Sequence, residues 1–159
     1  MTPSSRPFDN AHAVKCELAG EVLRSSGTLR LKVMGWSMLP AVWPGDTLVI
    51  ERIERGTVCE GDIVLFSRDR RLFAHRVVAM SSPAGNAKLL TRGDAMPRPD
   101  PPVGDSDLLG KVTYIVRNGK WIKPSRPQRS SERAVAALVR SSEIAARVVV
   151  GVHGTRQTS

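Results

Sequence analysis

Four polar side chains in this 159-residue chain together supply the groups that a nucleophilic hydrolase needs. Ser37 lies in the segment Val-Met-Gly-Trp-Ser-Met-Leu-Pro, where an alternating apolar pattern ends at a glycine. His75 lies within an apolar run, and Asp94 and Asp100 lie in a proline-rich loop. A serine needs a base to take its proton, and a neutral histidine needs a carboxylate that fixes its tautomer. The chain therefore contains one candidate nucleophile, one candidate base and two candidate orienting acids.

Each of these residues also has a common structural interpretation. A serine at a strand end is more often the N-cap of a helix, and the sequence around Ser37 alone favours that role. His75 shares one face of its predicted strand with Phe73 and Val77, as a core histidine bonded to a backbone carbonyl would. An aspartate in a loop usually caps a turn. Only the combination of the residue types favours catalysis.

The remaining histidines and the cysteines do not form a metal-binding pattern. Cys16 and Cys59 lie far apart in the sequence and form no Cys-x-x-Cys pair, and His12 and His153 are expected to be solvated. We therefore expect two reduced cysteines, with Cys16 half-buried, and no metal, disulfide or cofactor. Reduced cysteines favour a cytoplasmic location.

The elements that must position these residues begin with a helix that ends at about Ser26. Asp9 or Asn10 is expected to cap it, and Gly27 to end it. Gly20 costs about 1 kcal/mol relative to alanine, so the helix is expected to depend on docking. Its predicted apolar face consists of Ala11, Val14, Leu18 and Val22.

After the helix the apolar period changes from that of a helix to two residues, which indicates strands. Strands are predicted at residues 29–33, 47–53, 62–68, 71–80, 87–92, 108–117 and 120–123. Asn118-Gly119 predicts a tight hairpin turn before the last of them. The pattern predicts a mainly β fold, such as a small or partial barrel, with helices at both ends.

The predicted organisation is an N-terminal helix at residues 1–27, a β domain at 28–123 and a basic C-terminal segment at 124–159. In the last of these, residues 124–131 are a Pro- and Ser-rich linker. Residues 132–152 have an apolar face opposite a mainly basic stripe, which predicts an amphipathic helix.

The net charge of +9 is confined to the C-terminal third. Residues 1–110 hold 14 basic and 13 acidic side chains, whereas residues 111–159 hold 10 basic and 2 acidic. The near-neutral β domain argues against nucleic acid as a partner. The basic segment is expected either to dock on the β domain or to contact an anionic membrane surface. No apolar stretch is long enough for a transmembrane helix or a secretion signal, so a soluble cytoplasmic protein is expected.

Five sequence boxes in order resemble those of type I signal peptidases and the related LexA-like proteins. The boxes are Gly-Trp-Ser-Met-Leu-Pro at 35–40, Pro-Gly-Asp at 44–46, Gly-Asp-Ile-Val-Leu-Phe at 61–66, His-Arg-Val at 75–77 and Thr-Arg-Gly-Asp at 91–94, followed by Asp100 and Val103. Most bacterial members carry lysine in the fourth box. His75 is similar to the endoplasmic-reticulum, archaeal and spore-former branch.

The resemblance implies a catalytic role for each candidate. Ser37 would be the nucleophile and His75 the general base, with Asp100 orienting His75 and Asp94 supporting the site from close by. The backbone N–H of Ser37 would donate to the oxyanion. Many relatives have a serine as second donor at the position of Gly35, so here a backbone donor would replace it. A histidine base can accept a proton at neutral pH without the dry pocket that a lysine base needs.

The resemblance also implies a curled antiparallel β-sheet and an extended peptide substrate with small residues, such as alanine, at the cleavage site. Trp36, Met38 and Pro40 belong to the nucleophile box. Leu39, Val42 and Trp43 follow it and are expected to form an apolar substrate rim or part of the core. Signal peptidases have transmembrane anchors, and the apparent absence of one here is the main departure.

Three hypotheses follow from these observations. The first is a soluble serine endopeptidase. The second is a LexA-like regulatory module that cleaves itself or a partner, although the residues before the first strand are too few for a helix-turn-helix. The third is a non-catalytic peptide-binding domain that keeps the fold.

Overall fold

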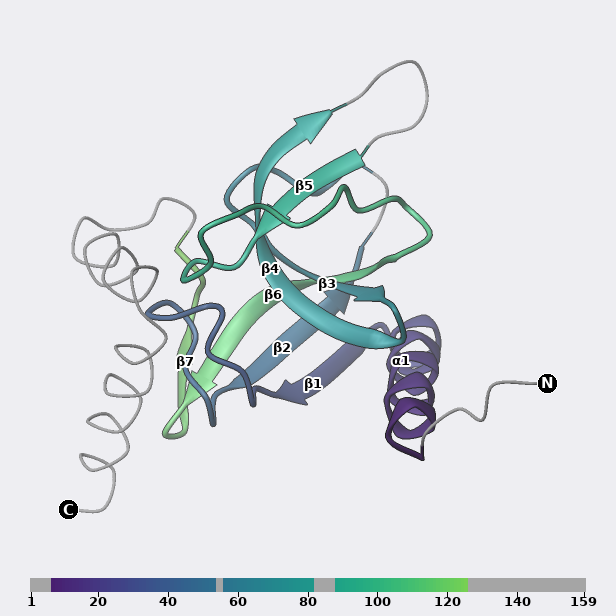
Figure 1. The fold of residues 1–159 in the computed structure, drawn as a ribbon. Helices are drawn as coiled ribbons and strands as arrows, with labels where there is room; N and C mark the ends of the chain where they lie inside the picture. The colour runs from purple at the N-terminus through teal and green to yellow at the C-terminus, as the bar shows by residue number, and fades with distance from the viewer. Residues whose placement is uncertain (1–6, 54–55, 82–87, 126–159) are drawn as a thin grey trace.

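The computed structural model of the protein describes residues 7–53, 56–81 and 88–125 (Figure 1). Helix α1 (Pro7–Ser26) precedes seven strands. They are β1 (Thr28–Lys32), β2 (Thr47–Arg52), β3 (Ile63–Arg68), β4 (Arg71–Ser81), β5 (Lys88–Arg92), β6 (Leu108–Arg117) and β7 (Lys120–Ile122). All paired strands are antiparallel. The prediction of a mainly β fold with an N-terminal helix is therefore confirmed.

The strand ends agree with the sequence pattern to within one residue. Alternating apolar residues and Gly- or Pro-containing turns mark a strand locally, so these bounds need little tertiary information. Asn118 and Gly119 both have positive φ, 50° and 74°. This is the geometry of the two-residue hairpin turn that their sequence predicts.

Two predictions about α1 were wrong. The helix begins at Pro7 rather than after a cap at Asp9 or Asn10, because proline is well suited to the first turn of a helix. Its predicted apolar face is not the docked one: Val14 and Leu18 are each 60% exposed. Ala19 and Leu23 are buried instead, and α1 contacts β1, β2, β4 and β6.

The strands form one sheet with the order β1-β2-β6-β3-β4-β5, and β7 also pairs with β6. Strand β6 has β2 along one edge, so its other edge is shared by β3 near Leu108–Lys111 and by β7 near Ile115–Arg117. Among the described strands β1 does not pair with β5, so the sheet remains open and no closed barrel is formed.

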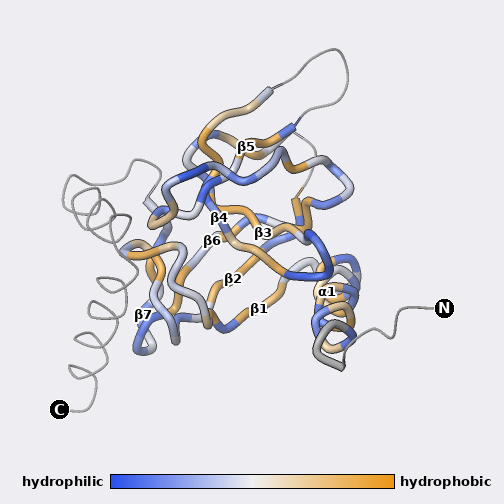
Figure 2. The backbone as a smooth tube through the Cα atoms, viewed as in Figure 1, coloured by the Kyte–Doolittle hydropathy of each residue, from blue (hydrophilic) through white to orange (hydrophobic). Residues whose placement is uncertain are grey.

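The core lies on both sides of β3, whose side chains alternate between two apolar clusters. Ile63 and Leu65 belong to a cluster that contains Leu23 of α1, and Val64 and Phe66 to a second one. Figure 2 shows the apolar character concentrated along the central strands. Strand β3 is therefore buried on both faces and pairs with β4 and β6 at the centre of the core.

Several expectations concern residues outside the described ones. The amphipathic helix at 132–152, most of the linker at 124–131 and the proposed membrane contact lie outside the described residues. Within residues 7–53, 56–81 and 88–125, no helix has the length and hydropathy that a membrane span requires.

Candidate functional site

Ser37 lies in a turn that connects β1 to β2, not at the start of a helix. The Leu39 N–H donates to the Trp36 carbonyl at 3.1 Å, and the Val42 N–H donates to the Met38 carbonyl at 2.9 Å. No helix follows Ser37 before β2 begins. The N-cap interpretation was therefore wrong, because the chain turns back into the sheet where a cap would require a helix.

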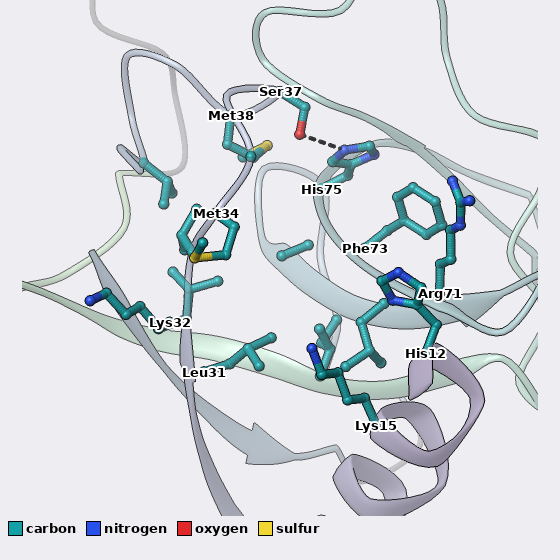
Figure 3. A pocket seen from close by; sticks show the side chains of 17 residues that line it. His12, Lys15, Leu31, Lys32, Met34, Ser37, Met38, Arg71, Phe73 and His75 are labelled. Carbon is teal, nitrogen blue, oxygen red and sulfur yellow. Dashed lines mark hydrogen bonds between the residues drawn. The ribbon is translucent and has the colours of Figure 1, made fainter. Parts of the chain in front are cut away.

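The structure brings Ser37, His75 and Asp100 into one hydrogen-bonded chain (Figure 3 shows Ser37 and His75). His75 Nε2 lies 3.0 Å from Ser37 Oγ, and His75 Nδ1 lies 2.7 Å from Asp100 Oδ2. Only 5% of His75 is exposed. The imidazole packs edge-on against Phe66 and tilted against Phe73, with ring centroids 6.0 and 5.8 Å away. The apolar rings therefore hold the imidazole between the hydroxyl and the carboxylate.

A further hydrogen bond holds the Asp100 carboxylate. The fully buried Thr91 donates its hydroxyl hydrogen to Asp100 Oδ2 at 2.7 Å, and the Asp100 N–H donates to the Thr91 carbonyl at 2.8 Å. Burial raises the pKa of Asp100, but the hydrogen bonds from His75 and Thr91, together with charge interactions with His75 and Arg68, leave that pKa below its ordinary value. Asp100 is thus held as a carboxylate facing His75.

Asp94 contacts a different residue. Its two carboxylate oxygens each accept a hydrogen bond from Arg76, from Nε and from Nη2, both at 2.8 Å. Both side chains are buried. Arg76 Nη1 also donates to the carbonyls of Gly61 and Ser125. Asp94 therefore ties the loop after β5 to β4, next to His75.

The same loop packs directly on the serine. The Ala95 N–H donates to the Ser37 carbonyl at 2.9 Å. A Cβ at Gly93 would lie 2.6 Å from the Ser37 carbonyl oxygen and 3.1 Å from Ser37 Cβ. Only a residue without a side chain permits this approach.

The aspartates of the two Gly-Asp boxes stabilise turns by accepting hydrogen bonds from backbone N–H groups. Asp46 Oδ2 accepts the Trp43 N–H at 2.8 Å and pairs with Arg117, which also donates to the Ala41 carbonyl. Asp62 Oδ2 accepts the Cys59 N–H at 2.9 Å and pairs with Lys111. Arg117 therefore anchors the turn after Ser37 to β6.

Ser37 and His75 lie at a pocket of about 520 Å³ between two strand edges. Residues 31–35, at the end of β1, line one side, and residues 71–75 of β4 line the other. Strand β4 pairs with β3 along one edge, and along its other edge it pairs with β5 only from Arg76 onward. The first half of this second edge therefore has no strand partner among the described residues. Since β2, β6 and β3 separate β1 from β4 in the sheet, the sheet must bend round this pocket.

The predicted substrate rim is only partly at the pocket. Leu39 is fully buried and does not line it, so this residue belongs to the core. Val42 and Met38 are buried and line the pocket, and both belong to the core cluster that contains Leu48. Trp43 is half-buried and does not line the pocket. Most apolar residues after Ser37 are buried in the core because the turn that contains them packs against the sheet.

The rest of the nucleophile box surrounds Ser37 in the turn. Gly35 is exposed and lines the pocket, whereas Trp36 and Pro40 are half-buried and do not. His12 is exposed as expected, but it lies at the pocket. Cys16 is half-buried, Cys59 is exposed and both are free, as predicted.

Sequence reasoning did not assign roles to Thr91, Arg76 or Gly93. A signal for Thr91 was present, because it is a polar residue on the same face of β5 as buried Leu89. In the described part of the chain, no group of three His, Cys, Asp or Glu side chains is arranged to hold a metal ion.

Comparison with known proteins supports the same type of chemistry. The Peptidase S24-like family matches residues 5–113, more than two thirds of the chain, and the match includes Ser37, His75 and Asp100. Among curated proteins no match is found. The family match agrees with the resemblance to LexA and signal peptidases without separating their branches. The chain therefore belongs to the Peptidase S24-like family, which comprises serine peptidases of the LexA and signal peptidase kind.

Proposed function

We propose that this protein is a serine endopeptidase in which Ser37 is the nucleophile, His75 the general base and Asp100 the residue that orients the base. The observation that carries the proposal is the hydrogen-bonded chain from Ser37 Oγ through both nitrogens of His75 to Asp100. A serine nucleophile with a histidine base requires this arrangement, whereas peptide binding alone does not.

The mechanism follows from the two hydrogen bonds of His75. Nε2 accepts the Ser37 proton as Oγ attacks the scissile carbonyl, and Asp100 stabilises the imidazolium through Nδ1. The protonated Nε2 then delivers its proton to the leaving amine, which gives an acyl-enzyme. A water molecule, deprotonated by His75, hydrolyses the ester and restores Ser37.

The oxyanion is assigned to the backbone at Ser37. The Ser37 N–H donates to none of the described residues, so it is available to the developing negative charge. Gly35 supplies no hydroxyl, so a second donor would come from backbone. Gly35 lines the pocket, which supports a site open to the substrate at this position.

The proposed substrate is an extended peptide. The exposed edge of β1 and the edge of β4 at residues 71–75 offer backbone groups to a peptide strand between them. The resemblance to signal peptidases adds small residues, such as alanine, at the cleavage site. A histidine at the position of the base supports the Ser-His branch of that superfamily as part of this proposal.

The test is hydrolysis of a fluorescence-quenched peptide that contains an Ala-x-Ala sequence. Replacing Ser37→Ala removes the nucleophile, so we expect kcat/KM to fall by at least about a thousandfold. Ser106 is an exposed serine outside the pocket, and Ser106→Ala is the matched control that keeps full activity. Circular dichroism checks that both variants fold.

Covalent labelling distinguishes the enzyme from a peptide-binding domain. A fluorophosphonate probe should modify the wild type at Ser37, as located by mass spectrometry of the digested protein, and should leave Ser37→Ala unlabelled. Equal hydrolysis by wild type and Ser37→Ala, or labelling at another serine, contradicts the proposal.

A further inference from the structure

One end of the pocket is lined by basic side chains. His12 and Lys15 of α1 and Arg71 of β4 line this end, whereas Lys32 of β1 lines the opposite side (Figure 3). No aspartate or glutamate of the described residues lines the pocket. Figure 3 shows Arg71 beside Phe73, Lys15 on α1 and His12 between them, all farther from Ser37 than His75 is. The end of the pocket nearest α1 is therefore cationic.

The distance from the nucleophile follows from the strand. Arg71 precedes His75 by four residues in β4, which is about 13 Å at the rise of an extended chain. Alternation places Arg71, Phe73 and His75 on the same face of that strand. A peptide that lies extended along this edge would bring its fourth residue from the scissile bond close to Arg71.

These basic groups have no acidic partner among the described residues, unlike the cations that support the fold. Arg76, Lys111 and Arg117 are each paired with a buried aspartate. Lys15, Lys32 and Arg71 are exposed and form no ion pair in the described part of the chain. The charges of Lys15 and Arg71 at the α1 end of the pocket therefore attract an anionic group of the ligand.

We propose that this cationic end selects peptide substrates that carry Asp or Glu about four residues from the cleavage site. This inference rests on the proposed function, because it assumes that the peptide reaches Ser37 along the edge of β4. The carboxylates would pair with Lys15 and Arg71, while the residues nearer the scissile bond occupy the apolar part of the pocket.

The expected preference is moderate, because the basic groups are exposed. One exposed ion pair contributes up to about fivefold in affinity, and two cooperating pairs give about tenfold or more at low salt. The preference should decrease when the ionic strength rises from about 0.02 to 0.5 M, since screening weakens exposed charges.

The experiment compares peptides that differ only in charge. Each contains Ala-x-Ala and carries Glu-Glu, Gln-Gln or Lys-Lys at the fourth and fifth positions, in one series before the scissile bond and in another after it. For the full chain we expect kcat/KM to be highest for Glu-Glu and lowest for Lys-Lys in one of the two series.

Charge-reversal variants identify the residues responsible. In the double variant Lys15→Glu/Arg71→Glu, the ratio of kcat/KM for Glu-Glu over Lys-Lys should fall below one. Lys120→Glu makes the same kind of charge change on β7, outside the pocket, and should keep the wild-type ratio. Because each ratio is measured within one variant, a general loss of activity does not affect it.

Binding separates a failure of this inference from a failure of the proposed function. Fluorescence anisotropy of the labelled peptides with Ser37→Ala should show the same order of affinity without hydrolysis. Ser37-dependent cleavage with no charge preference in either series, or a preference that persists in the double variant, overturns the inference alone. If no peptide is hydrolysed but Ser37→Ala binds Glu-Glu most tightly, the cationic end binds acidic peptides, whereas the catalytic proposal and the selection of substrates by this end both fail.

Discussion

His75 has one of the two candidate aspartates as its partner. Asp100 lies 2.7 Å from His75 Nδ1, whereas Asp94 forms a bidentate pair with Arg76. The two carboxylates therefore bind adjacent residues of β4: Asp100 binds His75 and Asp94 binds Arg76. The side chains of adjacent strand residues point to opposite faces of the sheet. Asp100 is in turn positioned by Thr91, so the proposed catalytic chain has a fourth member.

We expect Thr91→Val to lower kcat/KM by about tenfold, because a hydrogen bond to a charged group is worth about 1.5–3 kcal/mol. The lost donor should also raise the pKa of Asp100 and move the acid limb of the pH–rate profile to higher pH. Thr91→Ser should restore both values. Thr113→Val, which removes only a 3.4 Å hydrogen bond to Val49, is the control. An unchanged pH profile in Thr91→Val would mean that the hydroxyl does not act through Asp100.

The lowered pKa of Asp100 predicts a pH dependence of stability. The folded protein favours the carboxylate, so its contribution is present above the ordinary carboxyl pKa of about 3.9 and is lost as the pH falls through the lower folded value. Urea unfolding should therefore show a smaller stability difference between wild type and Asp100→Asn at pH 3 than at pH 6. Other carboxylates are common to both proteins and cancel. A pH-independent difference would contradict the assigned direction.

At the scale of elements, the site depends on two connecting segments held against each other. The turn after β1 carries Ser37, and the loop after β5 begins at Gly93 and reaches Asp100. They meet where the Ala95 N–H donates to the Ser37 carbonyl and where Gly93 leaves no room for a side chain. The separation of Ser37 from His75 is therefore set by this contact as well as by the sheet.

Gly93→Ala should push the two segments apart. Its Cβ would lie within 2.7 Å of the Ser37 carbonyl oxygen and of Met96, and overpacking of this kind costs about 1–3 kcal/mol. We expect kcat to fall by at least about tenfold with a smaller change in KM, because the Ser37–His75 hydrogen bond is stretched. Gly104→Ala is the matched control, since its Cβ would approach nothing closer than 4.0 Å. Equal kcat values for the two variants would show that the loop yields without moving Ser37.

At the scale of the whole molecule, Arg76 connects parts of the chain that are distant in sequence. Its guanidinium contacts Asp94 after β5, the Gly61 carbonyl before β3 and the Ser125 carbonyl after β7. Both members of the ion pair are buried, so each compensates the buried charge of the other.

Asp94→Asn should destabilise the protein by about 3–5 kcal/mol, because it leaves the buried Arg76 charge uncompensated. The free energy of unfolding in urea, measured at neutral pH, tests this. Glu21→Gln breaks the exposed pair with Arg24 and should leave stability nearly unchanged. Similar small losses in both variants would show that Arg76 is satisfied by the backbone carbonyls alone.

The sequence by itself determined the strands and the identity of the candidate residues. Period-two alternation and turn residues act over a few positions, so the bounds of β1 to β7 could be predicted to within one residue. The tertiary structure decided which surface each element buries. In α1 the periodicity indicated that the face with Val14 and Leu18 is buried, but docking buries Ala19 and Leu23 instead. Because α1 has apolar residues on several sides, its sequence alone does not determine which face contacts the sheet.

The same reasoning applies to the site. The residue types and their spacing identified Ser37, His75 and two alternative aspartates, and the family resemblance assigned Asp100 to His75. The contact itself, from His75 Nδ1 to Asp100 Oδ2, depends on the register of β4 and β5 and on the path of the loop that follows. The sequence did not indicate the basic end of the pocket, since Lys15 and Arg71 are 56 residues apart and line the same pocket only because α1 docks near β4. Contacts between distant segments depend on how the sheet bends, and no local pattern records that.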